Sequence, residues 1–156
     1  MSGALTITSE HGLSPVARAL ITALTTELAA LYPEDAGLVF SFEEHDVAPG
    51  RGVFLVAHAA GEPVGCAAVR TVGEGVGELK RMYVRPEARG RGVARAVLAA
   101  AEAQARRLGL RRLVLETGVR QGTALALYRT AGYTDIPVYG EFLGNPLSVC
   151  LAKDLT

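Results

Sequence analysis

The sequence predicts one α/β (α+β) domain that spans residues 1–156, with an antiparallel half followed by a β-α-β unit. Two strand-like runs, 51–59 and 63–71, are joined by a three-residue turn that contains glycine, which is typical of a β-hairpin. A third run, 78–84, leads through a glycine-rich turn into a long helical segment and then into a fourth run at 113–116, which indicates a β-α-β unit. The length suits a single hydrophobic core, and no linker or repeat interrupts this order.

A strand and a helix are expected before the hairpin. Residues 5–8 alternate between apolar and polar side chains like a first strand. Ser14 followed by Pro15 is typical of a helix start. Apolar residues then recur at helical spacing, at Val16, Leu20, Leu24, Leu28 and Leu31. The acidic stretch 33–49 follows, and we expect it to form a short irregular or helical connection on the substrate side.

Three further elements are expected after the fourth run. A helix over 121–130 is predicted to end at Ala131-Gly132, because glycine readily takes the left-handed conformation that ends many helices. Two more strands are expected around 133–138 and 146–152. The segment 139–146 between them is rich in turn residues, and we expect it to close a substrate pocket.

The composition excludes several classes of protein. Hydrophobic residues make up 49% of the chain and charged residues 21%, which is typical of a globular protein and not of a disordered one. Sixteen basic and sixteen acidic residues cancel, so no overall positive field is expected to attract nucleic acid or anionic lipid. No apolar run is long enough to span a membrane, and the start lacks a signal-peptide pattern, so we expect a cytoplasmic protein.

The cysteines and histidines predict no metal site. Cys66 and Cys150 each lie in an apolar segment, which indicates reduced, buried thiols that act as small hydrophobes. His11, His45 and His58 are scattered and have no metal-ligand spacing with these cysteines.

The turn at residues 89–94, Arg-Gly-Arg-Gly-Val-Ala, is the segment best suited to chemistry. It follows a strand and opens a helix with an apolar stripe at Val93, Val97, Leu98, Ala101, Ala105 and Leu108. A helix start presents unpaired N–H groups and the positive end of the helix dipole, and two arginines add charge, so the turn suits a phosphate or pyrophosphate. A triphosphate-binding loop would need a Gly-Lys-Ser/Thr ending, and a dinucleotide-binding turn would need glycine where Arg95 stands. The turn therefore supports neither a kinase nor a dehydrogenase.

Two motifs in this region resemble the GNAT superfamily of N-acetyltransferases. The first is Arg/Gln-x-x-Gly-x-Gly/Ala after a strand ending in Val-x-Pro, which here reads Arg89, Gly92 and Ala94 after Val84-Arg85-Pro86. The second is Asn-x-x-Ala-x-x-Leu-Tyr-x-x-x-Gly-Phe/Tyr, which appears as Gln121, Ala124, Leu127, Tyr128, Gly132 and Tyr133. Together they cover about residues 76–138, and the run 78–84 looks like a bacterial small-molecule subgroup of the superfamily.

The resemblance implies a fold and a cofactor site. The fold would be a mixed, mostly antiparallel sheet of six to seven strands, splayed at the cofactor site and flanked by about four helices. Acetyl-CoA would be the acyl donor, with its arm held by the backbone of Met82, Tyr83 and Val84. The pyrophosphate would be wrapped by Arg89, Gly90, Arg91, Gly92, Val93 and Ala94. Gln121 stands where the family has asparagine, one methylene longer, which puts its direct hydrogen bond to the cofactor in doubt.

The resemblance also implies catalytic residues. Tyr128 would protonate the departing CoA thiolate, since a phenol with a pKa near 10 is a reasonable acid for a thiolate. Glu78 is a candidate general base, Glu116 on the neighbouring strand competes with it, and a dedicated base is not required if positioning supplies the rate. Glu43 or Glu44 could instead neutralise a cationic substrate.

Two more expectations concern substrate and assembly. Lys80 and Arg81 are strand neighbours that should point to opposite faces, so at least one should face the cleft or its rim. The acceptor would be a primary amine on a small molecule or peptide. The alternatives are a CoA-binding regulatory or partner-binding domain without turnover, and an enzyme with a longer acyl donor. An exposed last strand would permit a homodimer.

Overall fold

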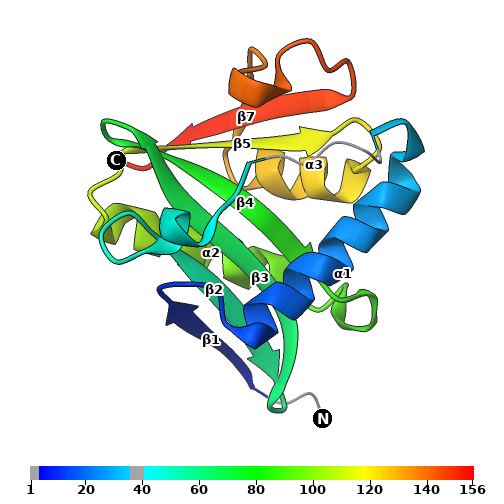
Figure 1. Cartoon of the computed structure of the whole chain (residues 1–156), viewed down its shortest axis with the longest axis vertical. Coiled ribbons are helices and arrows are strands. Elements are labelled where there is room, and N and C mark those ends of the chain that lie inside the picture. Colours follow the sequence, from blue (N-terminus) through cyan, green and yellow to red (C-terminus); the bar gives the residue numbers. More distant parts are fainter. Residues whose placement is uncertain (1–3, 36–40) are drawn as a thin grey trace.

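The computed structural model describes residues 4–35 and 41–156, which build a seven-stranded sheet in the order β1-β2-β3-β4-β5-β7-β6. Only the pair β4 and β5 is parallel, and every other neighbouring pair is antiparallel (Figure 1). The strands are β1 (Leu5–Glu10), β2 (Gly52–Ala59), β3 (Glu62–Gly73), β4 (Val76–Val84), β5 (Arg112–Gly118), β6 (Thr134–Ile136) and β7 (Ser148–Asp154). The prediction of a mixed, mostly antiparallel sheet is confirmed.

The described part of the chain contains three α-helices, against about four expected. They are α1 (Pro15–Leu31), α2 (Val93–Arg107) and α3 (Gly122–Thr130). Four short 3-10 turns complete the structure: η1 (Pro33–Asp35), η2 (Glu44–Val47), η3 (Pro86–Ala88) and η4 (Gly140–Phe142). The predicted connection over 33–49 therefore consists of short turns in its described parts, while residues 36–40 lie outside the described residues.

Helix α1 begins where the sequence predicts, and Leu20, Leu24 and Leu28 of its predicted stripe face the core, whereas the two ends of that stripe do not. The Ser14 hydroxyl accepts a hydrogen bond from the amide of Ala17 at 3.1 Å, which caps the helix start. The buried residues are Ala17, Leu20 and Leu24, whereas Val16 and Leu31 are 37% exposed. The true stripe includes a small alanine in place of the larger valine, which an analysis of large apolar residues overlooks.

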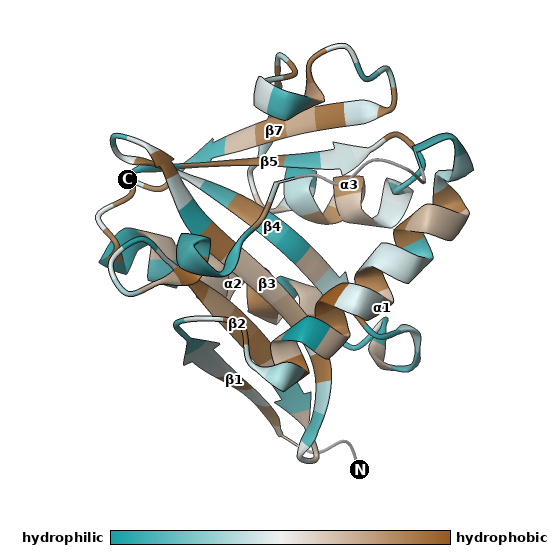
Figure 2. Cartoon of the chain, in the orientation of Figure 1, coloured by the Kyte–Doolittle hydropathy of each residue, from teal (hydrophilic) through white to brown (hydrophobic). Residues whose placement is uncertain are grey.

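The sheet separates two hydrophobic cores (Figure 1). Helix α1 covers one face, where Leu20 and Leu24 pack with Phe54 and Tyr83. Helices α2 and α3 cover the other face, which buries Leu79, Leu113, Leu115 and Leu151 among others. Figure 2 shows brown, apolar stretches on β2 and β3, the strands between these layers. All predicted stripe residues of α2 up to Ala105 are buried, while Leu108 is only partly buried and caps the helix end.

Strands β4 and β5 diverge toward one end of the sheet. Their parallel pairing runs from Val76–Arg112 to Leu79–Leu115, and both strands continue beyond it. Strand β4 also carries a bulge, because its register with β3 shifts between the pairs Ala68–Lys80 and Cys66–Tyr83. The expected splay is therefore present, and it opens next to this irregular part of β4.

The last strand does not lie at the edge of the sheet. Strand β7 pairs with β5 on one side and with the short strand β6 on the other. The premise of the predicted homodimer, an exposed last strand, is therefore wrong for this chain. In the described residues no helix is both long enough and apolar enough to cross a membrane.

Candidate functional site

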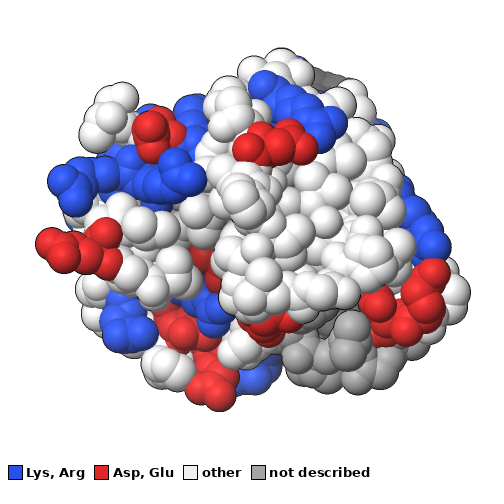
Figure 3. Space-filling view, turned by 90° about the horizontal axis from the view of Figure 1, so that it is seen from above, with Lys and Arg blue, Asp and Glu red and all other residues white. Residues whose placement is uncertain are grey.

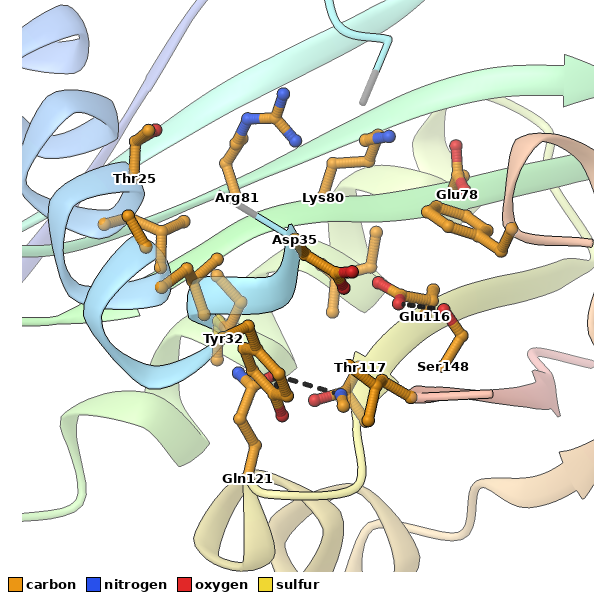
Figure 4. Close-up of a pocket in the computed structure, with 18 of the residues that line it drawn as sticks. Thr25, Tyr32, Asp35, Glu78, Lys80, Arg81, Glu116, Thr117, Gln121 and Ser148 are labelled. Atoms are coloured by element: carbon orange, nitrogen blue, oxygen red, sulfur yellow. Dashed lines mark hydrogen bonds between the residues drawn. The ribbon is translucent and has the colours of Figure 1, made fainter. Parts of the chain in front are cut away.

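A cavity of about 240 Å³ lies where β4 and β5 separate. Its walls come from the second half of α1, the bulged part of β4, the end of β5 and the start of α3 (Figure 4). Four of the predicted site residues line it: Glu78, Met82, Gln121 and Tyr128. Sequence segments far apart thus meet at this opening of the sheet, and Glu116, the competing base candidate, is there too.

Both Lys80 and Arg81 line this cavity, which corrects the expectation that strand neighbours face opposite ways. Arg81 has a φ of 55°, which is unusual for a residue other than glycine and belongs to the bulge in β4. Figure 4 shows the two side chains extending in the same direction from the strand. The bulge therefore adds a second cation to one wall, and alternation alone could not reveal it.

Glu78 is engaged in a buried network. The Arg70 guanidinium contacts its Oε1 through Nε and Nη2, both at 2.9 Å, and the Tyr139 hydroxyl donates to its Oε2 at 2.6 Å. Arg70 also donates to Asp46 Oδ2 at 3.1 Å. Glu78 is only 2% exposed, so both of its oxygens already have strong donors within the protein.

Glu116 is differently placed, on the neighbouring strand β5. It accepts a hydrogen bond from the Ser148 hydroxyl at 2.7 Å (Figure 4). Burial raises its pKa from the ordinary 4.5 to about 7, although the Ser148 hydrogen bond and the Lys80 charge oppose this rise. Nearby Glu78 and Asp35 raise the pKa further. This carboxyl group therefore gains and loses its proton near neutral pH.

Tyr128 is buried beside Tyr133, with ring centroids 5.8 Å apart in an edge-to-face arrangement. Burial is the main cause that raises its pKa above the ordinary 10, and the Glu116 charge adds to it. The premise of an ordinary phenol pKa is therefore wrong, and Tyr128 is a weaker acid than the sequence suggested. It stays protonated across the physiological range and can act as a hydrogen-bond donor.

The end of α1 is tied to the loop between β5 and α3. Gln121 Oε1 accepts hydrogen bonds from the Gly118 amide at 3.0 Å and the Tyr32 hydroxyl at 3.3 Å. The Tyr32 hydroxyl accepts from the Arg120 amide at 3.0 Å. A side chain at Gly118 would collide with the Tyr32 ring, so glycine is required there. Gln121 thus has partners within the protein, and its first role is to shape this wall.

The glycine turn before α2 lies outside the cavity. Gly90 and Gly92 have φ values of 78° and 80°, which glycine adopts without strain, and open space surrounds both. Gly92 is the N-cap of α2 and offers no side chain to its first amides. Arg89 bonds to Glu27 Oε1 at 2.6 Å and to the Val84 carbonyl at 2.9 Å. Its guanidinium is therefore already partnered by Glu27, which offsets part of the positive charge expected at the turn.

The other predicted residues separate into two groups. Tyr83 and Val84 are buried at 7% and 8% exposure and pack into the cores on either face of the sheet. Glu43 and Glu44 do not line the cavity; instead they contact His45 and Arg18, at 3.0 and 3.2 Å.

Several lining residues escaped the sequence analysis. Thr117 and Ser148 stand near the ends of strands that were predicted, Tyr32 caps the end of α1, and Asp35 and Phe142 lie in the short turns η1 and η4. The Thr117 hydroxyl is buried without a hydrogen-bond partner in the described structure. Only the antiparallel pairing of β5 with β7, which places Ser148 opposite Gly118, could have indicated Ser148.

The surface in view carries charges of both signs, and the described residues hold no cluster of metal ligands. Figure 3 shows Lys and Arg atoms next to Asp and Glu atoms in several mixed groups around an uncharged area, and no continuous basic surface extends across the side in view. Within residues 4–35 and 41–156, no three His, Cys, Asp or Glu side chains are grouped to hold a metal ion. Cys66 and Cys150 are buried free thiols, and burial raises the pKa of Cys66 to about 12, so this thiol is a poor nucleophile.

Comparisons with known proteins agree with this architecture. The chain is 40% identical over 152 residues to an IAA acetyltransferase of Azospirillum brasilense, covering 97% of this chain and 98% of that protein. It is 40% identical over 91 residues to an aminoglycoside N(6′)-acetyltransferase type 1 of Stenotrophomonas maltophilia, covering 53% and 60%. A crystal structure of a candidate acyl-CoA N-acyltransferase from Klebsiella pneumoniae superposes with a TM-score of 0.80 at 35% identity, covering 97% and 98%.

The family model of the GNAT acetyltransferases matches residues 17–133, which include α1, the splayed strands β4 and β5, the glycine turn and α3. The chain belongs to the GNAT family of acetyltransferases.

Proposed function

We propose that the protein transfers an acetyl group from acetyl-CoA directly to a primary amine of a small molecule or peptide. The observation that carries this proposal is the cavity at the divergence of β4 and β5, which brings together Glu116, with a pKa of about 7, and the buried phenol of Tyr128. The N(6′)-acetyltransferase and candidate N-acyltransferase relatives support nitrogen as the accepting atom.

Acetyl-CoA is the acyl donor, and the chain offers three features that fit it. The first turn of α2 presents backbone amides behind Gly90 and Gly92, where open space leaves room for a diphosphate. Arg91 is exposed beside them and adds a positive charge. In the splay, the unpartnered Thr117 hydroxyl on β5 and the unpaired edge of β4 at Met82 suit the amide groups of the pantetheine arm.

Glu116 is the better-placed base of the two candidates. An amine must lose a proton to attack the thioester, and an acceptor with a pKa near the working pH is best suited to take it. Glu116 has such a pKa and borders the cavity, while Glu78 has both oxygens committed to Arg70 and Tyr139. We therefore assign proton removal to Glu116 and a structural role to Glu78.

Tyr128 acts on the departing sulfur. Its neutral hydroxyl donates a hydrogen bond to the sulfur as the C–N bond forms and the C–S bond breaks, and it passes its proton as the thiolate leaves. Its raised pKa makes early proton transfer unfavourable, so its contribution comes late in bond cleavage. Tyr128 then regains a proton and Glu116 loses the amine proton, so the proton removed from the amine balances the one delivered to the sulfur and both groups return to their starting states.

The test measures binding and turnover separately. Acetyl-CoA at about 100 times its dissociation constant should stabilise the wild type by about 2.7 kcal/mol. Tyr128→Phe should keep this stabilisation and lose most thiol release in the presence of an amine panel. A wild type that binds acetyl-CoA but releases no thiol with any amine would instead be a regulatory domain, and absence of both effects would refute the proposal entirely.

The pH profile identifies the base. Wild-type kcat/KM should rise with pH through about 7, because Glu116 must be deprotonated to accept the amine proton. This ascending limb should be lost in Glu116→Gln. If the ascending limb is kept in Glu116→Gln and lost in Glu78→Gln, Glu78 is the base after all.

We further propose that the protein is a cytoplasmic enzyme of one domain, residues 1–156.

A further inference from the structure

The ammonium group of Lys80 is a buried cation that lacks a hydrogen-bond acceptor. Its side chain is 4% exposed, and Nζ has no hydrogen-bond partner among the described residues. Its nearest ion contact is Glu141 Oε2 at 3.5 Å, and the Phe142 ring centroid lies 5.5 Å away. A buried ammonium carries three donors, and leaving them unsatisfied is costly, so this group is suited to receive an acceptor from a ligand in the cavity.

The neighbouring carboxylates cannot fill this role. Glu141 accepts from the Ser41 amide at 2.7 Å through Oε1, while its Oε2 lies between Lys80 and Arg70, 3.8 Å from the latter. Glu78 is bonded to Arg70 and Tyr139. Each carboxylate near Lys80 is therefore shared with other donors, and the Lys80 ammonium is left incompletely compensated.

The diphosphate of acetyl-CoA is not the missing partner. None of the residues 89–94 lines the cavity, so the turn suited to phosphate is separate from the wall that carries Lys80. An anionic group that reaches Lys80 must therefore come from the second substrate. Arg81 borders the same space, which Asp35, Glu78 and Glu116 also line, so the case for a ligand carboxylate depends on the unsatisfied Lys80 ammonium alone.

We propose that the acceptor is a small molecule of the amino-acid type, whose carboxylate binds Lys80 while its amine lies at Glu116. This inference rests on the proposed acetyl transfer and specifies its acceptor. Lys80 on β4 and Glu116 on the neighbouring strand β5 both line one cavity of about 240 Å³, so a compact zwitterion in that cavity can contact both (Figure 4). Burial lowers the pKa of Lys80 and raises that of Glu116, so each group gains from a ligand charge of opposite sign.

The experiment compares matched acceptors that differ only in the carboxylate. L-leucine is paired with 3-methylbutylamine, L-phenylalanine with 2-phenylethylamine, and L-methionine with 3-(methylthio)propylamine. Thiol release from acetyl-CoA by the wild type should favour the amino acid in at least one pair by about tenfold or more in kcat/KM. Lys80→Met keeps a long, unbranched side chain and removes its charge. It should abolish this preference, because KM should rise for the amino acid alone.

Two controls accompany this variant. Lys80→Arg should retain a preference for the carboxylate, and Arg107→Met removes an exposed cation of α2 and should change neither member of a pair. If the wild type acetylates the plain amines as well as or better than the amino acids, the inference is overturned and the acetyltransferase proposal stands. An equal loss for both members in Lys80→Met also overturns it. No thiol release with any acceptor, together with no stabilisation by acetyl-CoA, overturns both.

Discussion

Replacing Glu116 with glutamine should change how stability depends on pH. The folded-state pKa of Glu116 is about 7 against an ordinary 4.5, so the native state holds this proton over a range where the unfolded chain has released it. The shift is about 2.5 units, and one unit corresponds to about 1.4 kcal/mol, so ionisation of Glu116 costs the native state about 3 kcal/mol. This cost is absent below pH 4.5, grows as pH rises and is complete above pH 7.

The assay is urea unfolding of the wild type and Glu116→Gln between about pH 5 and pH 8. The neutral amide carries no ionisation cost, so the variant should gain about 2 to 3 kcal/mol relative to the wild type over this range. The groups that act on Glu116, namely Ser148, Lys80, Glu78 and Asp35, remain in both proteins. Glu62→Gln, which removes an exposed carboxylate, serves as control. If the free energy of unfolding depends on pH in the same way in wild type and Glu116→Gln, the raised pKa of Glu116 is refuted.

Two further variants test the charge network and the glycine turn. Arg70→Met leaves Glu78 and Asp46 without their guanidinium partner, which should lower the free energy of unfolding in urea by about 3 kcal/mol. Arg112→Met removes one side of an exposed ion pair and should lower it by less than about 1 kcal/mol. Similar losses in the two would contradict the network. Gly92→Ala and Gly50→Ala both place a side chain at a positive φ in open space, so each should lower the free energy of unfolding by about 1 to 2 kcal/mol. Only Gly92→Ala should also weaken acetyl-CoA binding, which calorimetry measures. Unchanged affinity in Gly92→Ala would remove the turn from the cofactor site.

The parts of the fold that depend on local sequence were predictable. The hairpin itself was predicted, but its turn has two residues and not three, because Glu62 already pairs with Ala59. Ala60 and Gly61 adopt the left-handed φ values of 51° and 81° that such a turn needs. The start of α1 follows from Ser14 and Pro15, and the end of α3 from Gly132, which has a φ of 100°. In each case the signal and the structure it determines lie within a few residues of each other.

The arrangement of the site was less predictable because it depends on contacts between distant segments. The resemblance to the family makes Glu78 a candidate base, but its environment is set by Arg70 on β3 and Tyr139 before η4. Neither partner carries a local signal for this contact. Glu116 acquires its raised pKa only when the chain buries it beside Ser148 of β7. Burial and pairing of this kind arise from the tertiary structure, and no spacing in the sequence encodes them.

The irregularity at Arg81 also inverts which residues of β4 face each side of the sheet. Before it, Leu79 packs against the α2 layer; after it, Tyr83 packs in the α1 layer and Val84 in the α2 layer. If the alternation were not interrupted, Tyr83 would face the α2 layer and Val84 the α1 layer. The Tyr83 phenol would then compete for space with the aliphatic core under α2. With one residue fewer, strict alternation would leave Tyr83 and Val84 on their present sides, so the two cores do not require the extra residue. What it supplies is a second cation, Arg81, beside Lys80 on the lining of the cavity.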